Sequence, residues 1–249
     1  MINFFTIFIF ILCFNNISFA DGNEFNESFS RSKHILNEIY DDHRVTIYCE
    51  FSYDSYGNIN LPKGFNIEKY KNRAFSVEWD HVVPAENFGR TFKEWRDGSP
   101  KCKDNKGKHF KGRKCVERVS RDYRLMQADM YNLYPEMGSI NALRSNHNFE
   151  MLDISLDPIN DLCQMKIDGN KVEPPINSRG VIARTYKYME SSYPNYKMSN
   201  KQRRLMELWD KMYPVDEWEC KRSKRIERIQ GNKNKFVRDK CISLEEYKN

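Results

Sequence analysis

The stretch Glu78-Trp79-Asp80-His81-Val82-Val83-Pro84-Ala85 places a carboxylate directly before an imidazole in a segment with the character of a β-strand. Apolar residues alternate with more polar ones from Phe75 to Trp79, which predicts a strand over residues 75–83. Successive side chains of a strand point to opposite faces. Asp80 and His81 therefore reach a common metal ion or water only where the strand twists or bends. Taken alone, such a pair is more often an ordinary surface or buried pair.

A second element downstream makes the Asp-His pair more specific. Asn132-Leu133-Tyr134-Pro135 is followed, nine residues after Asn132, by Asn141, in a segment from Glu136 to Ser145 that we expect to begin a short helix. Two Asn residues around a Pro are by themselves ordinary turn chemistry. A strand with Asp-His, a loop and this Asn motif together resemble the ββα-metal arrangement called the His-Me finger.

The rest of the chain predicts more helix than strand. A further strand is expected from Arg44 to Phe51, and helices are expected from Asp122 to Asn132 and from Val181 to Ser191. The absence of βαβ alternation and of a glycine-rich phosphate loop argues against a Rossmann-type nucleotide fold. The sequence thus predicts an α+β fold, mixed and mostly helical, with a single domain built around the ββα-metal core.

The clearest helix signal begins at Ser199, where Gln202 completes a capping box. The apolar residues that follow recur at helical spacing and predict a stripe packed into the core: Leu205, Met206, Leu208, Trp209 and Met212. A stripe of Met and aromatic residues at this spacing indicates core packing rather than a cofactor site.

The first twenty residues carry no Lys, Arg, Asp or Glu and contain an apolar run from Phe4 to Phe14. The small-residue pattern Ser18-Phe19-Ala20 follows, which predicts a signal peptide over residues 1–20. A transmembrane anchor is the alternative, but the run is shorter than the roughly 20 residues that cross a bilayer. Residues 21–249 would then be the mature chain of an exported protein, periplasmic or extracellular, with no membrane anchor.

Signal removal takes Cys13 and leaves an even number of cysteines: Cys49, Cys102, Cys115, Cys163, Cys220 and Cys241. Disulfides are the natural interpretation in an exported chain, although these cysteines allow fifteen connectivities. Cys102 and Cys115 bracket a Lys/Gly-rich segment typical of a stapled loop. A Cys49–Cys241 bond would join the two ends, which leaves Cys163 for Cys220. No Cys-x-x-Cys pair supports the alternative of metal binding by thiolates.

The formal net charge of +6 is unchanged by signal removal, because the removed segment is uncharged. Basic residues cluster near the C-terminal end and face only Glu227 and Asp239: Lys221, Arg222, Lys224, Arg225, Arg228, Lys233, Lys235, Arg238 and Lys240. Such a run is commonly a solvated helix face. A footprint for a phosphate backbone is the other interpretation, with Lys221, Arg222, Lys224 and Arg225 as candidate substrate-binding residues.

The chain also resembles one family closely, the secreted bacterial endonuclease I family of periplasmic and extracellular nucleases. The resemblance covers nearly the whole mature chain. It rests on Tyr48-Cys49, Glu78 to Ala85, Phe88-Gly89, Gly112-Arg113-Lys114, Asp129 to Leu133, Glu173-Pro174-Pro175, Ile182-Ala183-Arg184-Thr185-Tyr186, Lys211-Met212-Tyr213-Pro214-Val215, Trp218-Glu219-Cys220 and Gln230-Gly231-Asn232. Motifs of this length are far more specific than any single spacing.

The resemblance implies roles for individual residues. His81 matches the family's general base, which takes a proton from the water that attacks phosphorus. Asp80 and Asn141 match the protein ligands of one Mg²⁺ ion. Arg113 matches the arginine that contacts the scissile phosphate, and Asn132 matches the first Asn of the motif, which holds the loop around the site.

Three positions depart from the family pattern. Asp80 stands where Glu is common, and its shorter side chain requires the ion to lie closer to the strand. Gln127 stands where relatives often carry Glu, and Tyr131 stands where a His is frequent. A role that depends on charge at position 127, or on a second imidazole at 131, is thus in question. The remaining histidines match no motif and are interpreted as structural or surface residues: His34, His43, His109 and His147.

Phosphodiester hydrolysis builds negative charge on the oxygens around phosphorus, which a divalent ion and an Arg stabilise most in the transition state. Oxygen ligands with few protein carboxylates suit Mg²⁺ better than zinc. We therefore expect a monomeric, Mg²⁺-dependent endonuclease acting on DNA, with RNA as a further candidate and with little sequence preference. The alternatives are a DNA-binding or DNA-uptake protein that has lost catalysis, and a metal-free ribonuclease, for which a second catalytic histidine is lacking.

Overall fold

The structure is a computed structural model that describes residues 22–248, with side chains described as far as Ile242. The predicted signal peptide, residues 1–20, lies outside the described residues. Within residues 22–248, no helix combines the length and the apolar character that a membrane crossing requires.

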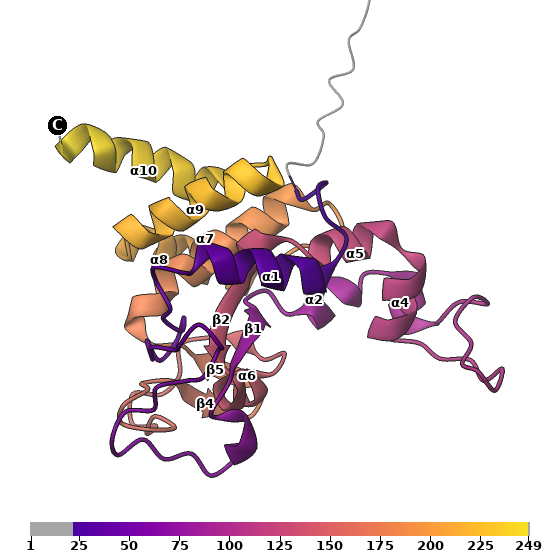
Figure 1. Ribbon diagram of the computed structural model, residues 1–249, viewed down its shortest axis with the longest axis horizontal. Helices are drawn as coiled ribbons and strands as arrows, with labels where there is room; N and C mark the ends of the chain where they lie inside the picture. Colours follow the sequence, from indigo (N-terminus) through magenta and orange to yellow (C-terminus); the bar gives the residue numbers. More distant parts are fainter. Residues whose placement is uncertain (1–21, 249) are drawn as a thin grey trace, which may run out of the picture.

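Two strands that are distant in the sequence pair at the centre of the molecule (Figure 1). β1 (Val77–His81) runs antiparallel to β2 (Leu133–Met137), with Asp80 opposite Tyr134 in the register. α6 (Gly138–Arg144) begins as soon as β2 ends. The strand predicted around His81 and the short helix predicted after Pro135 are therefore confirmed.

A glycine lets α6 begin close to β1. A Cβ atom at Gly138 would lie 2.7 Å from the backbone oxygen of Arg73 and 2.7 Å from Oε1 of Glu78. At the other end of the helix, the buried Arg144 side chain donates through Nη1 to the backbone oxygen of His81 at 2.7 Å. The start of α6 thus lies near Glu78 and its end is bonded to His81, so the helix spans the length of β1.

Helices and short strands surround this unit. The other α-helices are α1 (Phe29–Ile39), α2 (Ala85–Gly89), α3 (Lys93–Arg96), α4 (Arg113–Val119), α5 (Arg121–Gln127), α7 (Ile176–Ser192), α8 (Asn200–Met212), α9 (Glu217–Gln230) and α10 (Lys235–Lys248). Two 3-10 turns are η1 (Lys71–Arg73) and η2 (Met130–Asn132). The short strands β3 (Asn148–Phe149), β4 (Lys166–Asp168) and β5 (Lys171–Glu173) form a second sheet in the order β3-β5-β4, with only the β3–β5 pair parallel. This content confirms the predicted mixed, mostly helical α+β fold.

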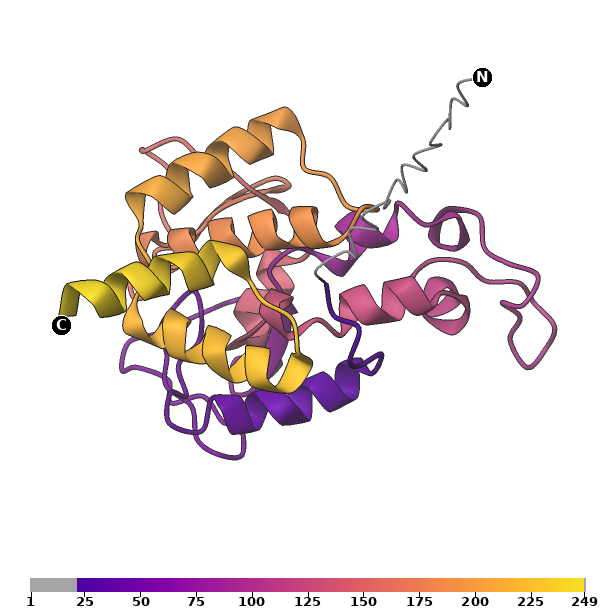
Figure 2. The same cartoon turned by 90° about the horizontal axis from the view of Figure 1, so that it is seen from above.

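The long helices of the C-terminal half gather on one side of β1 and β2. α7 packs along α8, and α10 folds back on α9 and also contacts α7. In both views α1 lies next to α9, while α4 and the loop before it extend away from the other helices (Figures 1 and 2). The end of β1 that carries His81 thus lies among α1, α2 and α5.

The strand predicted from Arg44 to Phe51 is absent. The chain reverses direction within this segment, and Val45 forms a single bridge with Ser52. Glu50 adopts a positive φ of 54°, which the backbone of a continuing strand does not allow. The Val- and Ile-rich composition predicted a strand because it gives no sign of this reversal.

The helix predicted from Asp122 to Asn132 is divided in two. α5 ends at Gln127, and the Asp129 side chain then accepts a hydrogen bond from the backbone N–H of Tyr131 at the start of η2. Such local side-chain bonds compete with helix continuation. The interruption turns the chain into β2.

The helix predicted to begin after Ser199 is confirmed as α8, and the Ser199 hydroxyl accepts from the Gln202 backbone N–H at 3.1 Å. The predicted apolar stripe is only partly buried. Met206 and Trp209 lie in the core, whereas Leu208 is 50% exposed and Met212 is 56% exposed. The predicted core packing is therefore confirmed for Met206 and Trp209 and wrong for Leu208 and Met212.

Three disulfides link the described cysteines, and they correct the predicted pairing. Cys102 bonds to Cys115, as predicted for a stapled loop. The other predicted bonds, Cys49–Cys241 and Cys163–Cys220, are wrong, because Cys49 bonds to Cys163 and Cys220 bonds to Cys241. The return of α10 onto α9 brings Cys241 to its near neighbour in sequence instead of to the other end of the chain.

These pairings predict how the protein responds to loss of each bond. Cys49–Cys163 closes a sequence separation of 114 residues and Cys102–Cys115 one of 13. Replacing both Cys49 and Cys163 by Ser should lower the free energy of unfolding by about 2–5 kcal/mol, measured in urea, and the Cys102/Cys115 double variant should lose less. Peptide mapping without reduction checks the connectivity directly, and a peptide that joins Cys49 to Cys241 would contradict it.

Candidate active site

The His81 imidazole is held by the backbone of α5. Its Nε2 lies 2.8 Å from the backbone oxygen of Gln127. A carbonyl oxygen only accepts hydrogen bonds, so Nε2 carries the hydrogen and the neutral ring keeps its lone pair on Nδ1. The ring is therefore oriented as a base that takes up a proton at Nδ1.

The surroundings of His81 keep the ring neutral. The side chain is 7% exposed, and its ring centroid lies 4.9 Å from Phe29 and 6.2 Å from Phe88. Burial lowers the pKa of His81 to about 3, and the positive charges of Arg113 and Arg144 act in the same direction. A histidine that is neutral at neutral pH can accept a proton without first losing one.

Gln127 also holds the predicted phosphate-binding arginine. Arg113 is the first residue of α4, is exposed, and donates through Nε to Oε1 of Gln127 at 3.0 Å. The same Gln127 side chain donates through Nε2 to Oε1 of Glu117 at 2.6 Å. Only an amide does both, because a Glu at 127 would have no hydrogen to donate to Glu117. The neutral residue at this position thus orients Arg113 without a charge of its own.

Asn132 fixes the chain directly after the histidine. Its side chain is fully buried, accepts from the backbone N–H of Val83 at 2.7 Å and donates to the backbone oxygen of the same residue at 3.0 Å. These two bonds have the pattern of one hydrogen-bonded residue pair in a β-sheet. They fix the position of the segment after His81.

The two predicted metal ligands lie on the opposite face of β1 from His81. Asp80 is 4% exposed; its Oδ2 accepts from the Tyr48 hydroxyl at 2.6 Å, and its Oδ1 lies 3.2 Å from Nη1 of Arg144. Asn141 is half-buried and donates through Nδ2 to Oε2 of Glu78 at 2.8 Å. The structure therefore brings Asn141 into contact with Glu78 rather than with Asp80.

This face of β1 offers oxygen atoms of the kind that Mg²⁺ prefers. Glu78 and Asp80 alternate onto one face of the strand, and Asn141 approaches from α6 with its Oδ1 not engaged by another described side chain. Carboxylate and amide oxygens in small number, completed by water, suit Mg²⁺. Among the described residues, no group of three or more His, Cys, Asp or Glu side chains is arranged to hold a metal ion. Both carboxylates of this face are paired with an arginine, Glu78 with Arg73 and Asp80 with Arg144.

The basic residues predicted to bind substrate lie on α9, away from His81. Arg222 is 2% exposed, and its guanidinium donates to the hydroxyls of Tyr40 and Tyr134 and to two backbone oxygens. Arg222 is therefore a structural residue, and its prediction as a DNA contact is corrected, because no part of its charge faces solvent.

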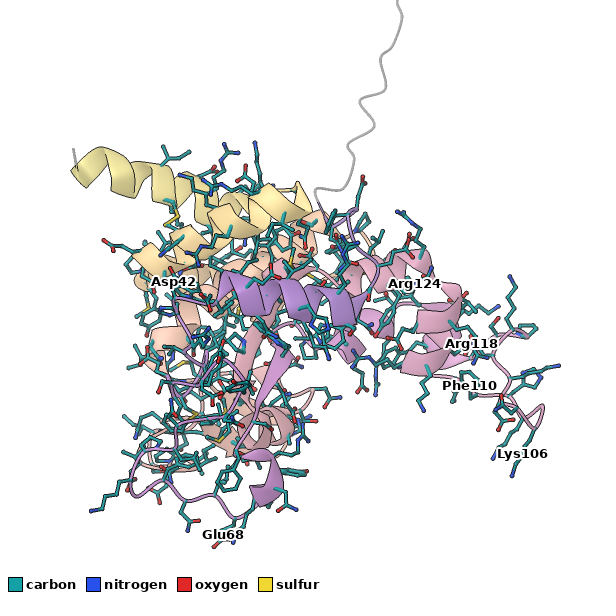
Figure 3. All side chains as sticks on the ribbon, viewed as in Figure 1. Asp42, Glu68, Lys106, Phe110, Arg118 and Arg124 are labelled. Carbon is teal, nitrogen blue, oxygen red and sulfur yellow. A yellow bond between two sulfur atoms is a disulfide. The ribbon has the colours of Figure 1, made fainter. Side chains whose placement is uncertain are left out.

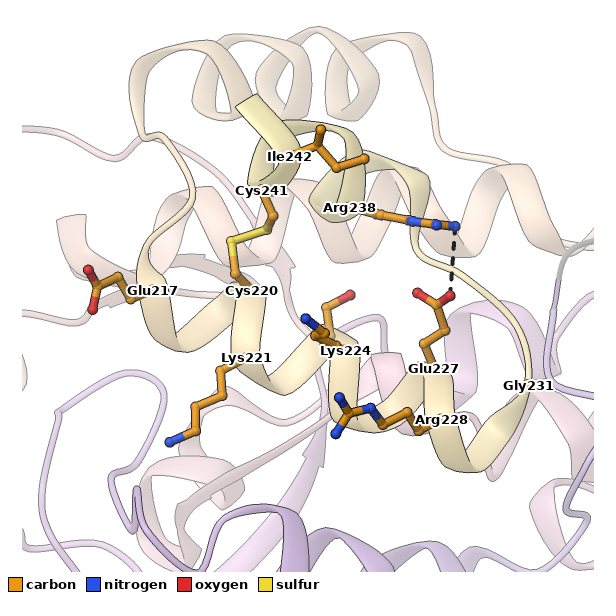
Figure 4. A pocket seen from close by; sticks show the side chains of 11 residues that line it. Glu217, Cys220, Lys221, Lys224, Glu227, Arg228, Gly231, Arg238, Cys241 and Ile242 are labelled. Carbon is orange, nitrogen blue, oxygen red and sulfur yellow. Dashed lines mark ion pairs between the residues drawn. A yellow bond between two sulfur atoms is a disulfide. The ribbon is translucent and has the colours of Figure 1, made fainter. Parts of the chain in front are cut away.

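The other predicted substrate-binding residues on α9 differ in whether their charge is free to contact a phosphate. Arg225 donates to Asp42 at 2.6 and 2.8 Å, and Lys221 also pairs with Asp42. Lys224 is exposed and lines a pocket between α9 and α10 (Figure 4). Lys221 and Arg225 thus share the carboxylate of Asp42, whereas Lys224 has no ion pair with a described side chain.

The family model described as Endonuclease I matches residues 18–241. The chain belongs to the Endonuclease I family. It is 36% identical over 222 residues to an "Extracellular deoxyribonuclease" of Aeromonas hydrophila, covering 86% of this chain and 90% of that protein. It is 38% identical over 221 residues to "Endonuclease-1" of Buchnera aphidicola subsp. Acyrthosiphon pisum, covering 86% and 82%. A "Periplasmic deoxyribonuclease" of Aeromonas hydrophila is 36% identical over 222 residues, covering 86% and 87%.

The sequence analysis missed several residues that position the site of this Endonuclease I family member. Tyr48 donates to Asp80, and its backbone N–H donates to the buried carboxyl of Glu136 at 2.7 Å. Burial raises the pKa of Glu136 to about 8. Strand alternation could have placed Glu78 with Asp80, and the i, i+3 spacing from Asn141 could have placed Arg144 on the same helix face. Tyr48 belongs to the Tyr48-Cys49 motif, but nothing local indicated that its hydroxyl donates to Asp80.

The lowered pKa of His81 predicts its titration in this Endonuclease I family member. In the metal-free protein, the imidazole should stay neutral, with its hydrogen on Nε2, as the pH falls from about 7 to about 4. The unfolded chain binds a proton near pH 6.5, so acidification below that value should also favour unfolding. ¹⁵N NMR of the histidine rings measures both tautomer and midpoint. A midpoint of His81 near its ordinary value would contradict the burial that we describe.

Proposed function

We propose that this member of the Endonuclease I family is an exported, Mg²⁺-dependent endonuclease that hydrolyses phosphodiester bonds of DNA, with RNA as the second substrate to test. The observation that carries the proposal is the double role of Gln127. Its backbone oxygen orients the His81 ring, and its side chain orients Arg113. One residue thus sets the relative position of a base and of a group that binds phosphate.

In the proposed reaction, His81 accepts through Nδ1 a proton from the water that attacks phosphorus. As the new P–O bond forms, the bond from phosphorus to the leaving sugar oxygen breaks, and that oxygen takes a proton from solvent water. Arg113 binds the scissile phosphate, where its fixed charge stabilises the negative charge that builds in the transition state. The Gln127 amide keeps the guanidinium in place, so the charge does not have to reorganise as the reaction proceeds. His81 contacts the water and Arg113 contacts the phosphate, so neither reads a nucleobase. The reaction therefore needs no particular nucleotide sequence.

Asp80 and Asn141 would hold the Mg²⁺ ion, with Glu78 beside them to orient Asn141. The ion supplies Lewis-acid stabilisation of the phosphate and leaving oxygen when it is bound. The shorter Asp80 side chain is anchored by Tyr48 and Arg144, which fix the direction of its carboxylate close to the strand.

Export is supported by two independent observations. The relatives bear the names extracellular and periplasmic deoxyribonuclease. The three disulfides of this chain need an oxidising compartment to form and persist. The activity would thus be directed at DNA outside the cytoplasm.

Nicking of supercoiled plasmid tests the proposal. The oxidised protein should cut the plasmid in Mg²⁺, EDTA should stop the reaction, and His81→Ala should lower the rate on the order of 10²–10⁴-fold because the base is lost. His34→Ala is the matched control, since His34 is exposed on α1 and has no part in the site; it should cut as the wild type does.

Each other outcome has a distinct meaning. A folded wild-type protein that binds the plasmid but leaves it intact in Mg²⁺ would contradict the enzyme and favour a DNA-binding protein. Cutting that survives EDTA would contradict the proposed requirement for Mg²⁺. An unchanged rate in His81→Ala would contradict the proposed role of His81 as the general base. The same assay with RNA as substrate shows whether the enzyme discriminates between ribose and deoxyribose.

A further inference from the structure

A segment directly before and within α4 carries a concentration of positive charge of which the mechanism above uses only Arg113. Residues 101–118, which we call the basic arm, contain eight Lys and Arg residues and only two acidic residues, Asp104 and Glu117. The formal charge of the arm is therefore +6, equal to the formal charge of the entire chain. All other positive and negative charges of the protein balance one another.

The basic arm is a defined structure that projects from the body of the protein. Lys103 forms a bridge with His109, and the Phe110 backbone N–H donates to the oxygen of Cys102 at 3.0 Å. Arg118 braces it from α4, donating to the oxygen of Lys103 at 2.8 Å with its guanidinium carbon 4.8 Å from the centroid of the Phe110 ring. Figure 3 shows Lys106 at the tip, with Phe110 and Arg118 nearer the base.

The lysines of the arm are available to bind an anion. Lys101, Lys103, Lys106, Lys108, Lys111 and Lys114 are all exposed, and none of them forms an ion pair with a described side chain. Asp104 forms no ion pair with these lysines; its Oδ1 accepts from the backbone N–H groups of Lys106 and Lys108 in the turn. This differs from α9, where Asp42 neutralises Lys221 and Arg225.

The arm is joined directly to the catalytic arginine. Cys102 bonds to Cys115, so the base of the arm is fastened to α4 two residues after Arg113. The chain also passes from Lys111 into α4 through Gly112, whose φ of 81° makes the sharp turn. Any displacement of the arm relative to Arg113 would have to deform this closed loop.

We propose that the basic arm binds the phosphate backbone of the DNA substrate to one side of the scissile phosphate. The inference rests on the proposed function, since Arg113 binds the phosphate that is cut and the arm extends the same positive surface along the strand. Lysine is a flexible point charge, so a row of lysines holds phosphates without reading bases. The arm and Arg113 then place successive phosphates in register with His81.

Binding measurements test this without depending on cleavage. In the His81→Ala background, Lys103→Gln, Lys106→Gln, Lys108→Gln and Lys111→Gln are combined, and the affinity for fluorescent duplex DNA is measured by anisotropy over a range of salt. Each lost phosphate contact should lower the slope of log affinity against log salt by about 0.9. The full variant should bind more weakly than its parent, and Lys106→Gln with Lys108→Gln should have an intermediate effect.

The control removes the same number of lysines elsewhere, through Lys69→Gln, Lys71→Gln, Lys197→Gln and Lys211→Gln, all exposed. This control should keep the parent slope. If the arm variant and the control have equal affinity and slope while the wild type cuts plasmid, the proposed DNA contact of the arm is wrong and the proposed nuclease activity is retained. If the wild type does not cut, the proposed function fails, and the binding result still decides whether the arm contacts DNA. Thermal unfolding of each variant confirms that the fold is intact.

Discussion

A buried guanidinium needs acceptors near its charge, and this requirement determines how the elements of the site meet; of the Arg144 nitrogens, Nη1 and Nη2 have acceptors and Nε has none among the described residues. Arg144 is fully buried at the end of α6, where it reaches the Asp80 carboxylate and the backbone oxygens of His81 and Val82. An unpaired charge at this depth would cost several kcal/mol. α6 can therefore cross β1 only where these three acceptors are presented together, which places Asn141 opposite Glu78 and leaves His81 on the other face.

The same constraint explains why the basic C-terminal half is structural. Arg222 joins α9 to α1 and β2 through two tyrosine hydroxyls and two backbone oxygens. Arg184, also buried, joins α7 to α9 through the Glu219 carboxylate and contacts Asp210 of α8. These cross-links fix the helices behind β1 and β2. The buried arginines thus cross-link the fold, whereas the lysines of the basic arm are exposed and form no ion pair with a described side chain.

Local sequence patterns predicted the elements that depend on neighbours in the chain. Alternation gave β1, the capping box gave α8, and the Asn motif gave α6. Contacts between distant segments were beyond reach: Gln127 acts on His81 through a backbone oxygen, which carries no sequence signature. The charge run on α9 could not reveal that Arg222 faces inward, because a run of cations occupies every face of a helix. The cysteine pairing depended on the return of α10, which no local pattern encodes.

We propose that His81, Arg113 and the oxygen-bearing side chains on the other face of β1 act on one phosphate, which they would reach from three elements. A crystal structure of His81→Ala with bound duplex DNA and Mg²⁺ tests it most directly. Our account predicts a backbone phosphate in contact with the Arg113 guanidinium, next to the vacated position of the imidazole, and an ion bound by Asp80 and Asn141. A duplex bound on α9, with Arg113 free of phosphate, would contradict it.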